Sequence, residues 1–243
     1  MKAMILAAGR GERMRPLTDT SPKPLLNVGG IPLIGHHLQR LQAAGFRDIV
    51  INHAWLGQQI EATLGTGSTY GVNICYSAEE KGGLETAGGI ATALPLLGHK
   101  PFLVINGDVL TDIDFAQALK IGAKIEQTGK LAHLWLVDNP EHHSDGDFSL
   151  TQTGDVTTEQ PHNPTLTFSG IGVYHPALFN SIPPHTRAKL APLLRTAMQK
   201  NQISGEYHTG YWLDVGTKER LHLANQWVNK NRGEYLTDMT NIQ

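Results

Sequence analysis

A short segment near the N-terminus combines glycines with basic side chains, as a site for phosphate groups would require. Gly9 and Gly11 follow the apolar run 3–8, and Arg13 and Lys23 come next. Glycine lets a backbone approach a ligand closely and offer its amide N–H groups to phosphate oxygens. Arginine and lysine neutralise phosphate charge. The segment therefore predicts a site for a phosphorylated ligand.

Two common glycine motifs are absent from this segment. The dinucleotide fingerprint GxGxxG would need a glycine where the chain has Met14, and the Walker sequence GxxxxGK[ST] does not occur. A tight turn alone would explain Gly9 and Gly11, but not the basic residues that follow. Prolines on both sides of Lys23 restrict the backbone and disfavour a helix. We therefore expect Lys23 on a stiff, extended arm.

Two aspartates follow apolar segments and are candidates for a metal site. Asp108 comes after the strand-like run 101–106, and Asp214 comes after Trp212. A side chain at the carboxyl end of a parallel strand points into the crevice where open α/β sheets bind ligands. A buried aspartate is costly without a partner. Alternatively, Asp108 is a turn residue, and Asp214 bonds the turn at Thr217.

Short apolar runs alternate with helical patterns, which indicates an α/β fold with a mainly parallel sheet. A glycine-rich loop is expected over 79–89. Strands are expected at 3–8, 48–52, 72–76, 101–106, 130–137 and 165–174, with a hairpin over 148–158 and short strands at 203–207 and 211–215. Helices are expected at 34–45, 56–64, 90–97, from Asp112 or Asp114 to about 125, at 176–181 and 190–198, and after a cap at Thr217.

Composition excludes several classes of protein. The 243 residues include 20 Lys+Arg and 22 Asp+Glu, so the net charge of −2 argues against a nucleic-acid or membrane-surface binder. The single cysteine, Cys75, excludes an intramolecular disulfide and lies in a strand-like run, so we expect a buried thiol. The pairs His36-His37 and His142-His143 are expected at the surface. The apolar start is too short for a signal peptide and no run is long enough to span a membrane, so a cytoplasmic protein is expected.

The glycine and lysine elements together resemble the signature of the sugar-1-phosphate nucleotidyltransferases. That signature is a strand, then [AG]-G-x-G-x-R-[LM], a spacer, and P-K-P-[LM]-L; the chain has AGRGERM at 8–14 and PKPLL at 22–26. The resemblance extends over nearly the whole chain. It implies one Rossmann-like nucleotidyltransferase domain over 1–230, with a mainly parallel mixed sheet flanked by helices. A nucleotide-binding half would span 1–110, a sugar-binding half 111–230 and a tail 231–243, with no room for the C-terminal β-helix of some relatives.

The resemblance also implies roles for particular residues. Arg13 and Lys23 would be catalytic, and Asp108 and Asp214 would hold Mg²⁺. The nucleotide would be bound by Ala8, Gly9, Gly11, Glu80, Gly83 and Thr86, and the sugar by Asn106, Asp147, Glu159, Ser169 and Gly170. Whether Glu79 or Glu80 faces the base stays open. The family's lysine after the sugar-binding glutamate is Gln160 here, so another cation or the metal would replace it.

The implied activity is transfer of a nucleotidyl group from a nucleoside triphosphate to a sugar 1-phosphate, with release of pyrophosphate. Glu85 stands where most relatives have glycine, and the resulting LET sequence at 84–86 is similar to the bacterial branch that uridylylates N-acetylmuramic acid 1-phosphate in cell-wall recycling. UTP is therefore the favoured nucleotide. Alternatives are mannose 1-phosphate with GTP, glucose 1-phosphate with dTTP or UTP, and a non-catalytic nucleotide-binding regulatory subunit. A monomer is preferred, with no nucleic-acid or membrane partner.

Overall fold

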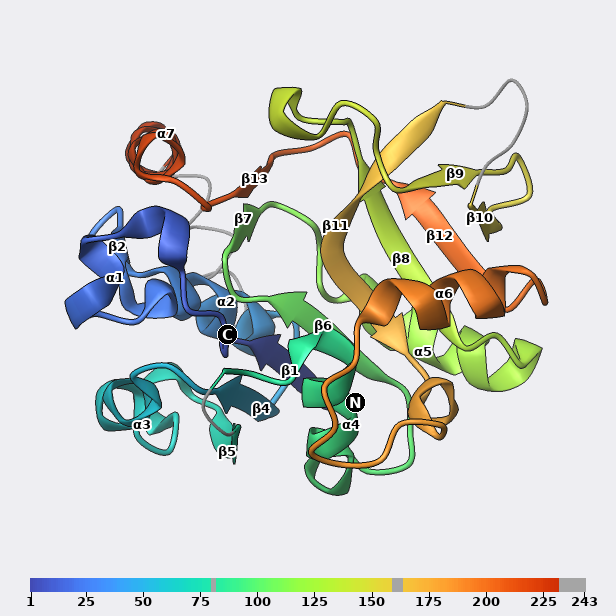
Figure 1. Cartoon of the computed structure of the whole chain (residues 1–243), viewed down its shortest axis with the longest axis horizontal. Helices are drawn as coiled ribbons and strands as arrows, with labels where there is room; N and C mark the ends of the chain where they lie inside the picture. The colour runs from blue at the N-terminus through green and yellow to red at the C-terminus, as the bar shows by residue number, and fades with distance from the viewer. Residues whose placement is uncertain (80–81, 159–163, 232–243) are drawn as a thin grey trace.

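A nine-stranded mixed sheet organises the computed structural model, which describes residues 1–79, 82–158 and 164–231 (Figure 1). The strand order is β10-β9-β11-β6-β1-β4-β5, with β8 beside β11 and β12 beside β8. These strands are β1 Ala3–Leu6, β4 Asp48–His53, β5 Asn73–Ala78, β6 Phe102–Asn106, β8 Ala132–Val137, β9 Phe148–Leu150, β10 Val156–Thr157, β11 Thr165–Tyr174 and β12 Ile203–Tyr207. Strands β5, β4, β1 and β6 are mutually parallel, whereas β11 runs antiparallel to β6 and β8.

Helices cover both faces of the sheet because its central strands are apolar on both sides. On β1, Ala3 and Ile5 belong to one buried cluster and Met4 to the other. The first cluster packs under α2 Leu33–Ala43, α3 Gly57–Leu64 and α5 Gln117–Thr128, and the second under α4 Glu85–Leu97 and α6 Leu190–Met198. The layers are therefore helix, sheet and helix.

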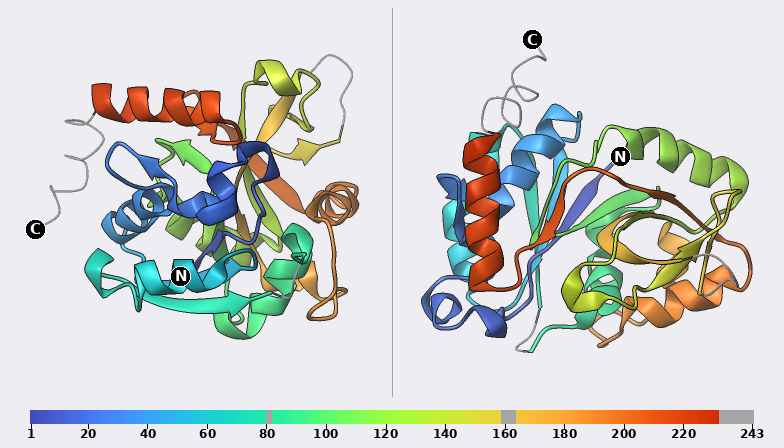
Figure 2. Two further views of the ribbon diagram at one scale, coloured as in Figure 1. Left: turned by 60° about the vertical axis from the view of Figure 1, so that its left-hand side comes forward. Right: turned by 90° about the horizontal axis from the view of Figure 1, so that it is seen from above.

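A third, smaller core fastens the C-terminal helix to the N-terminal segment. Helix α7, Lys218–Lys230, begins at a cap where the Thr217 side chain accepts a hydrogen bond from the backbone N–H of Arg220. Its Ala224 and Val228 pack with Met14, and Figure 2 shows α7 beside the blue N-terminal segment. The remaining short elements are α1 Leu17–Thr20 and the strand pairs β2 Asn27–Val28 with β3 Ile31–Pro32, and β7 Val109–Thr111 with β13 Trp212–Asp214.

The predicted α/β fold, with a mixed sheet flanked by helices, is confirmed, and four local expectations are wrong. Helix α4 begins at Glu85 rather than 90. Lys23 starts a 3₁₀ turn, Lys23–Leu25, rather than lying on an extended arm. Cys75 is exposed, because β5 is an edge strand with one open face. His36 and His37 are 1% and 2% exposed, because they lie on the inner side of α2.

Other expectations fall outside the described residues or stay predictions. Most of the predicted tail, like Glu80 and Glu159, is not described. The division of the domain into nucleotide and sugar halves remains a prediction. In the described ranges 1–79, 82–158 and 164–231, no helix combines the length and apolarity that crossing a bilayer requires.

Candidate active site

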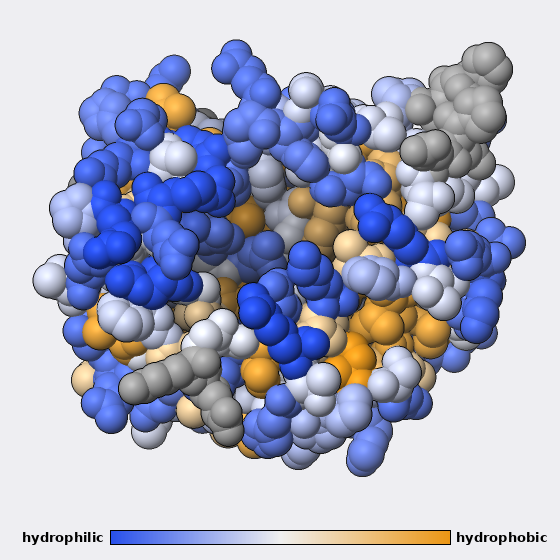
Figure 3. Space-filling model, viewed as in Figure 1, coloured by the Kyte–Doolittle hydropathy of each residue, from blue (hydrophilic) through white to orange (hydrophobic). Residues whose placement is uncertain are grey.

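Two cavities open at the carboxyl ends of the central strands, and Figure 3 shows the hollow in this face. The larger has a volume of about 1110 Å³ and the smaller about 370 Å³. Arg13, Asn106 and Asp108 line both. Of the predicted residues, Ala8, Gly9, Gly11, Lys23, Gly83 and Thr86 line the larger cavity, and Ser169, Gly170 and Asp214 line the smaller. Two ligands bound in the two cavities would therefore meet at the shared wall.

The loop after β1 needs its glycines for two different reasons. Gly11 has a φ of 68°, and a Cβ there would lie 2.9 Å from the Thr18 side chain. Gly9 borders the larger cavity, and nothing lies within 4 Å of the place that a Cβ would take, so its backbone is open to a ligand. The 3₁₀ turn Glu12–Met14 follows, and its buried Met14 anchors Arg13 at the shared wall. This loop presents backbone N–H groups and one exposed cation to the same space.

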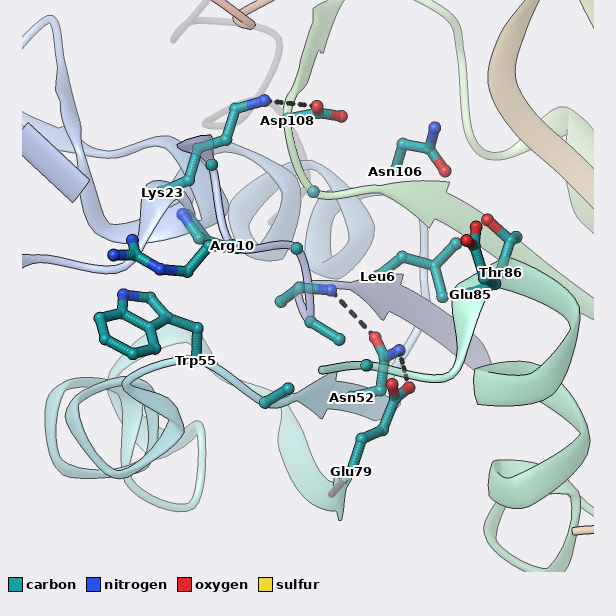
Figure 4. Close-up of a pocket in the computed structure, with 18 of the residues that line it drawn as sticks. Leu6, Arg10, Lys23, Asn52, Trp55, Glu79, Glu85, Thr86, Asn106 and Asp108 are labelled. Carbon is teal, nitrogen blue, oxygen red and sulfur yellow. Dashed lines mark hydrogen bonds and ion pairs between the residues drawn. The ribbon is translucent and has the colours of Figure 1, made fainter. Parts of the chain in front are cut away.

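Lys23 and Asp108 form an ion pair at the shared wall. The Nζ of Lys23 lies 2.6 Å from Oδ2 of Asp108, and Figure 4 shows the pair at the edge of the larger cavity. The Lys23 residue is only 9% exposed, so its charge needs this partner in the absence of a ligand. Gly107 allows the tight turn before Asp108, because a Cβ there would lie 2.6 Å from the Leu6 carbonyl oxygen.

Asp214, on β13, lines the smaller cavity together with Asp108. Val215 donates its backbone N–H to the Asp108 carbonyl at 2.7 Å, so the two aspartates are held on adjacent chain segments. Oδ2 of Asp214 lies 3.0 Å from Nη2 of Arg220, and Oδ1 lies 3.2 Å from Nε2 of His142. Oδ1 is buried, and although His142 is near, no group in the described residues has hydrogen-bond geometry toward it.

This donor set fits a magnesium ion. A buried carboxylate oxygen without a hydrogen bond is the kind of atom that a cation satisfies. Mg²⁺ prefers oxygen ligands and usually takes one or two carboxylates, with phosphate oxygens and waters completing its octahedron. Within the described residues no group of three or more His, Cys, Asp or Glu side chains could hold a metal. Asp108 and Asp214 would therefore hold Mg²⁺ only together with phosphate oxygens of a substrate.

A hydrogen-bonded chain holds the far side of the larger cavity together (Figure 4). Asn52, at the end of β4, accepts from the Ala7 backbone N–H at 2.9 Å and donates to Oε1 of Glu79 at 2.6 Å. Oε2 of Glu79 accepts from the Leu84 backbone N–H at 2.7 Å. Glu79 is thus tied to the scaffold on both carboxylate oxygens, and Asn52 was not predicted. The sequence signal that could have identified Asn52 is a polar residue at the end of an apolar parallel strand. The same signal identified Asp108.

The glycines at the start of α4 serve close packing rather than a loop. A Cβ on Gly88 would run into the Thr186 carbonyl oxygen, and one on Gly89 into the Glu79 carboxylate. The Ala188 carbonyl accepts hydrogen bonds from the N–H groups of Ala87 and Gly88 at 3.0 and 3.1 Å. The segment before α6 therefore covers the beginning of α4.

Glu85 has a φ of 61°, in the left-handed region. Its carboxylate lies 3.0 Å from Nη2 of Arg187, and both residues line the larger cavity. Side chains with this backbone conformation are uncommon. A glycine would have no steric cost at this position.

The predicted sugar residues are only partly brought together. Gly170 has a φ of 78° and packs closely against Asn106. A Cβ at Gly170 would lie 3.0 Å from the Asn106 Cβ. Ser169 is fully buried, and its carbonyl accepts from the Trp212 indole N–H at 2.8 Å. Asp147 lines neither cavity: it accepts a hydrogen bond at 2.8 Å from the backbone N–H of Phe168, which lines the smaller one.

One aromatic and one basic side chain, Trp55 and Arg10, complete the rim of the larger cavity. The sequence did not lead us to predict either as a site residue. The Arg10 guanidinium lies 3.7 Å over the Trp55 ring and donates to the Thr18 carbonyl at 2.9 Å. It also lies 3.1 Å from Asp19, and this hydrogen bond, helped by Arg15, holds the pKa of Asp19 below its usual value. Trp55 follows β4 by two residues, and nothing in its spacing singled it out.

Comparison with known proteins gives consistent results. A family model described as nucleotidyl transferase matches residues 2–231. An N-acetylmuramate alpha-1-phosphate uridylyltransferase of Neisseria meningitidis is 63% identical over 231 residues, covering 93% of this chain and 100% of the relative. A protein of the same name from Caulobacter vibrioides is 34% identical and covers 88% and 91%.

More distant relatives have other names. A mannose-1-phosphate guanylyltransferase of Mycobacterium tuberculosis is 31% identical, covering 89% of this chain and 61% of that protein. A crystal structure from Bacillus anthracis, described as a putative glucose-1-phosphate thymidylyltransferase in complex with a sucrose, has a TM-score of 0.81 at 24% identity and covers 98% and 99%. That structure supports the fold alone. The family match over almost the full chain shows that this protein belongs to the nucleotidyl transferase family.

Proposed function

We propose that the protein transfers the uridylyl group of UTP to N-acetylmuramic acid 1-phosphate and releases pyrophosphate. The observation that supports this most directly is the shared wall of Arg13, Asn106 and Asp108 between a large and a small cavity. Such an arrangement suits a reaction that joins two phosphorylated substrates. The choice of substrates rests on the Neisseria relative, which this chain matches over that protein's full length at 63% identity.

The chemistry requires no nucleophile from the protein. An oxygen of the sugar phosphate attacks the α-phosphorus of the nucleotide in line, a new P–O bond forms, and the bond to pyrophosphate breaks. The protein contributes positioning and electrostatic stabilisation. The backbone N–H groups of Gly9 and Gly11 would hold phosphate oxygens, and Arg13 would stabilise the departing pyrophosphate. Lys23 would turn from Asp108 to the α-phosphate, where its charge stabilises the transition state.

Asp108 and Asp214 would hold Mg²⁺ at the shared wall. When bound, the ion would neutralise phosphate charge and help align the two phosphates. Asp214 supports this assignment through its buried, unsatisfied Oδ1. With Asp108 directed at the ion, Lys23 would lose its present partner and would be free to bind the substrate.

The nucleotide would lie in the larger cavity with its base toward Gly83 and Thr86. The hydrogen bonds of Asn52 and Leu84 to Glu79 hold this wall in place. The sugar would lie in the smaller cavity beside Ser169 and Gly170, with Asn106 at the junction. Glu80 and Glu159 stay proposed contacts to the nucleotide and the sugar, and Asp147 becomes a positioning residue.

We also propose a cytoplasmic, monomeric enzyme that acts in cell-wall recycling. The location follows from the use of UTP, a cytoplasmic metabolite, and the recycling role follows from the muramic acid substrate. The location is tested by locating the protein in fractionated cells, and the monomeric state is tested by measuring the protein's mass in solution.

A substrate panel tests the proposed reaction. UTP, dTTP and GTP would each be paired with the 1-phosphates of N-acetylmuramic acid, N-acetylglucosamine, glucose and mannose, and pyrophosphate release would be measured with and without Mg²⁺. We expect the highest kcat/KM for UTP with N-acetylmuramic acid 1-phosphate. A clear preference for another pair would reject the substrate assignment. Absence of turnover with every pair would instead support a non-catalytic nucleotide-binding subunit.

A further inference from the structure

We propose that His143, oriented by Asp147, recognises the carboxylate of the muramic acid substrate; this rests on the proposed function. N-acetylmuramic acid differs from N-acetylglucosamine by a lactyl ether that ends in a carboxylate. A site that prefers the first sugar needs a hydrogen-bond donor, preferably a cation, where that carboxylate lies. The structure points to His143 through the composition of the smaller cavity and through the fixed position of its ring.

The smaller cavity has few groups that could receive an anion. Its described wall includes the carboxylates Asp108 and Asp214, which repel another carboxylate when no cation is bound. Arg13 is at the shared wall, where we have assigned it to pyrophosphate. The other basic residues among those lining the cavity are His142 and His143. They lie on the 3₁₀ turn Glu141–His143, between β8 and β9, and the His142 side chain reaches Asp214 on β13.

The two histidines differ in what their rings face. Nε2 of His142 lies 3.2 Å from Oδ1 of Asp214, so His142 is already directed at the proposed metal ligand. Nε2 of His143 lies 3.1 Å from Oδ1 of Asp147, which lines neither cavity. In the described part of the chain, this is the one hydrogen bond of the His143 side chain. Its Nδ1 edge therefore stays available to a ligand.

Asp147 is well held, so it can orient the ring. Its Oδ2 accepts from the Phe168 backbone N–H at 2.8 Å, and its own backbone N–H donates to the Leu166 carbonyl at 2.8 Å. Both partners belong to β11, whose next residues, Ser169 and Gly170, line the smaller cavity. The position of the His143 ring is thus tied to the same strand that forms the sugar pocket.

The turn itself is also braced. The His143 backbone N–H donates to the Pro140 carbonyl at 2.8 Å, and Asn139 donates to the carbonyls of Ser144 and Thr165 at 3.0 and 3.1 Å. A ring held in this way loses little further freedom on binding, which favours recognition. A doubly protonated His143 would donate from Nε2 to Asp147 and from Nδ1 to the substrate carboxylate. A charge-assisted hydrogen bond of this kind is among the stronger polar contacts.

The test compares two sugars that differ in the carboxylate. For the wild type and for His143→Gln, kcat/KM is measured with UTP and the 1-phosphates of N-acetylmuramic acid and N-acetylglucosamine. We expect the ratio of the two values to fall about tenfold or more in His143→Gln. If one sugar is not turned over, its inhibition constant against the other gives the same comparison. His143→Arg, which restores a cation, should recover most of the ratio.

Two further variants separate recognition from a structural effect. Asp147→Asn should lower the ratio by a smaller factor, because it leaves the ring in place but weakens its orientation. His222→Gln, the same substitution on the exposed face of α7, should leave it unchanged. Circular dichroism and Tm would verify folding.

The possible failures are distinguishable. A wild type that does not prefer the muramic acid substrate rejects the proposed function. A wild-type preference that survives in His143→Gln, or an equal loss with both sugars, overturns the role of His143 alone. The role of His143 would also be overturned if the ratio of the two kcat/KM values fell in His142→Gln instead of in His143→Gln.

Discussion

The Nζ atom of Lys23 lies 2.6 Å from Oδ2 of Asp108, so the N-terminal loop and the end of β6 are joined by an ion pair at the shared wall. The lysine comes from a turn framed by prolines, and the aspartate from a turn that only glycine at 107 permits. Two groups with opposite charge are therefore placed where two phosphates would meet. In the proposed reaction each has a different partner, the α-phosphate for Lys23 and the metal for Asp108.

Removing the lysine should reduce turnover more than it affects folding. We expect Lys23→Ala to lower kcat by a factor of about 10² or more, because a preorganised cation at the α-phosphate is lost. The matched control is Lys130→Ala, which breaks the 2.6 Å ion pair of Lys130 with Asp155 away from the site. Steady-state kinetics would measure both. Normal kcat in Lys23→Ala would contradict the assigned role.

Asp214 should govern the affinity for the metal. We expect Asp214→Asn to raise the Mg²⁺ concentration for half-maximal activity by about tenfold or more, since even groups that only support metal ligands have effects of this size. Calorimetric titration with Mn²⁺ in the presence of UTP provides a readout that does not depend on turnover. Asp155→Asn serves as the control. Unaltered Mn²⁺ binding in Asp214→Asn would remove this residue from the metal site.

Asn52 should affect the nucleotide more than the sugar phosphate. Asn52→Ala leaves the Ala7 N–H and one oxygen of Glu79 without their partner, so the wall of the larger cavity loosens. We expect kcat/KM for UTP to fall about tenfold, as loss of a buried hydrogen-bond partner commonly costs about 1–3 kcal/mol. The control is Asn73→Ala. This change removes the exposed hydrogen bond that Asn73, on the edge strand β5, donates to Asp48. An increase confined to the KM of the sugar phosphate would contradict this view.

One buried histidine, His37, and one half-buried histidine, His133, should make the fold less stable as the pH falls below neutrality. Burial lowers the pKa of His37 to about 3 and that of His133 to about 4, from an ordinary value of 6.5. Below pH 6.5 the unfolded chain therefore binds more protons than the folded chain, so stability is lost as the pH falls toward these values. Each group contributes a slope of up to about 1.4 kcal/mol per pH unit.

Urea unfolding at about pH 7.5, 6.0 and 5.0 would measure this slope. The variant His133→Phe, which keeps a ring beside Trp135, should reduce the slope by the share of one histidine. His222→Gln, on the exposed helix face, should keep the wild-type slope. A free energy of unfolding that stays the same over this pH range would contradict the neutral state of both rings.

Much of the site was predictable because its residues follow rules of position. Three of these features depend only on the local chain. They are the glycine with a positive φ at Gly11, the polar residue after a parallel strand at Asp108, and the helix cap at Thr217. What failed depends on contacts from distant segments. Gly88 and Gly89 look like loop residues, yet they let residues 186–188 and Glu79 approach a helix.

The same limit explains the histidines and the cysteine. His36 is buried because β2 and β3 fold over α2 and the Val28 carbonyl lies 2.8 Å from its Nε2. Cys75 is exposed although Ser77, two residues on along the edge strand β5, is buried. Neither the partner of a helix face nor the order of strands in a sheet can be taken from residue spacing alone.

The common wall of the two cavities has a kinetic consequence. A nucleotide sugar, being the joined product, would fill both cavities and touch Arg13, Asn106 and Asp108 from both sides. It would therefore compete with each substrate separately, and an excess of either substrate would displace it. A stable mimic of the joined product would gain from both binding events at once, because linking two ligands makes the second association intramolecular.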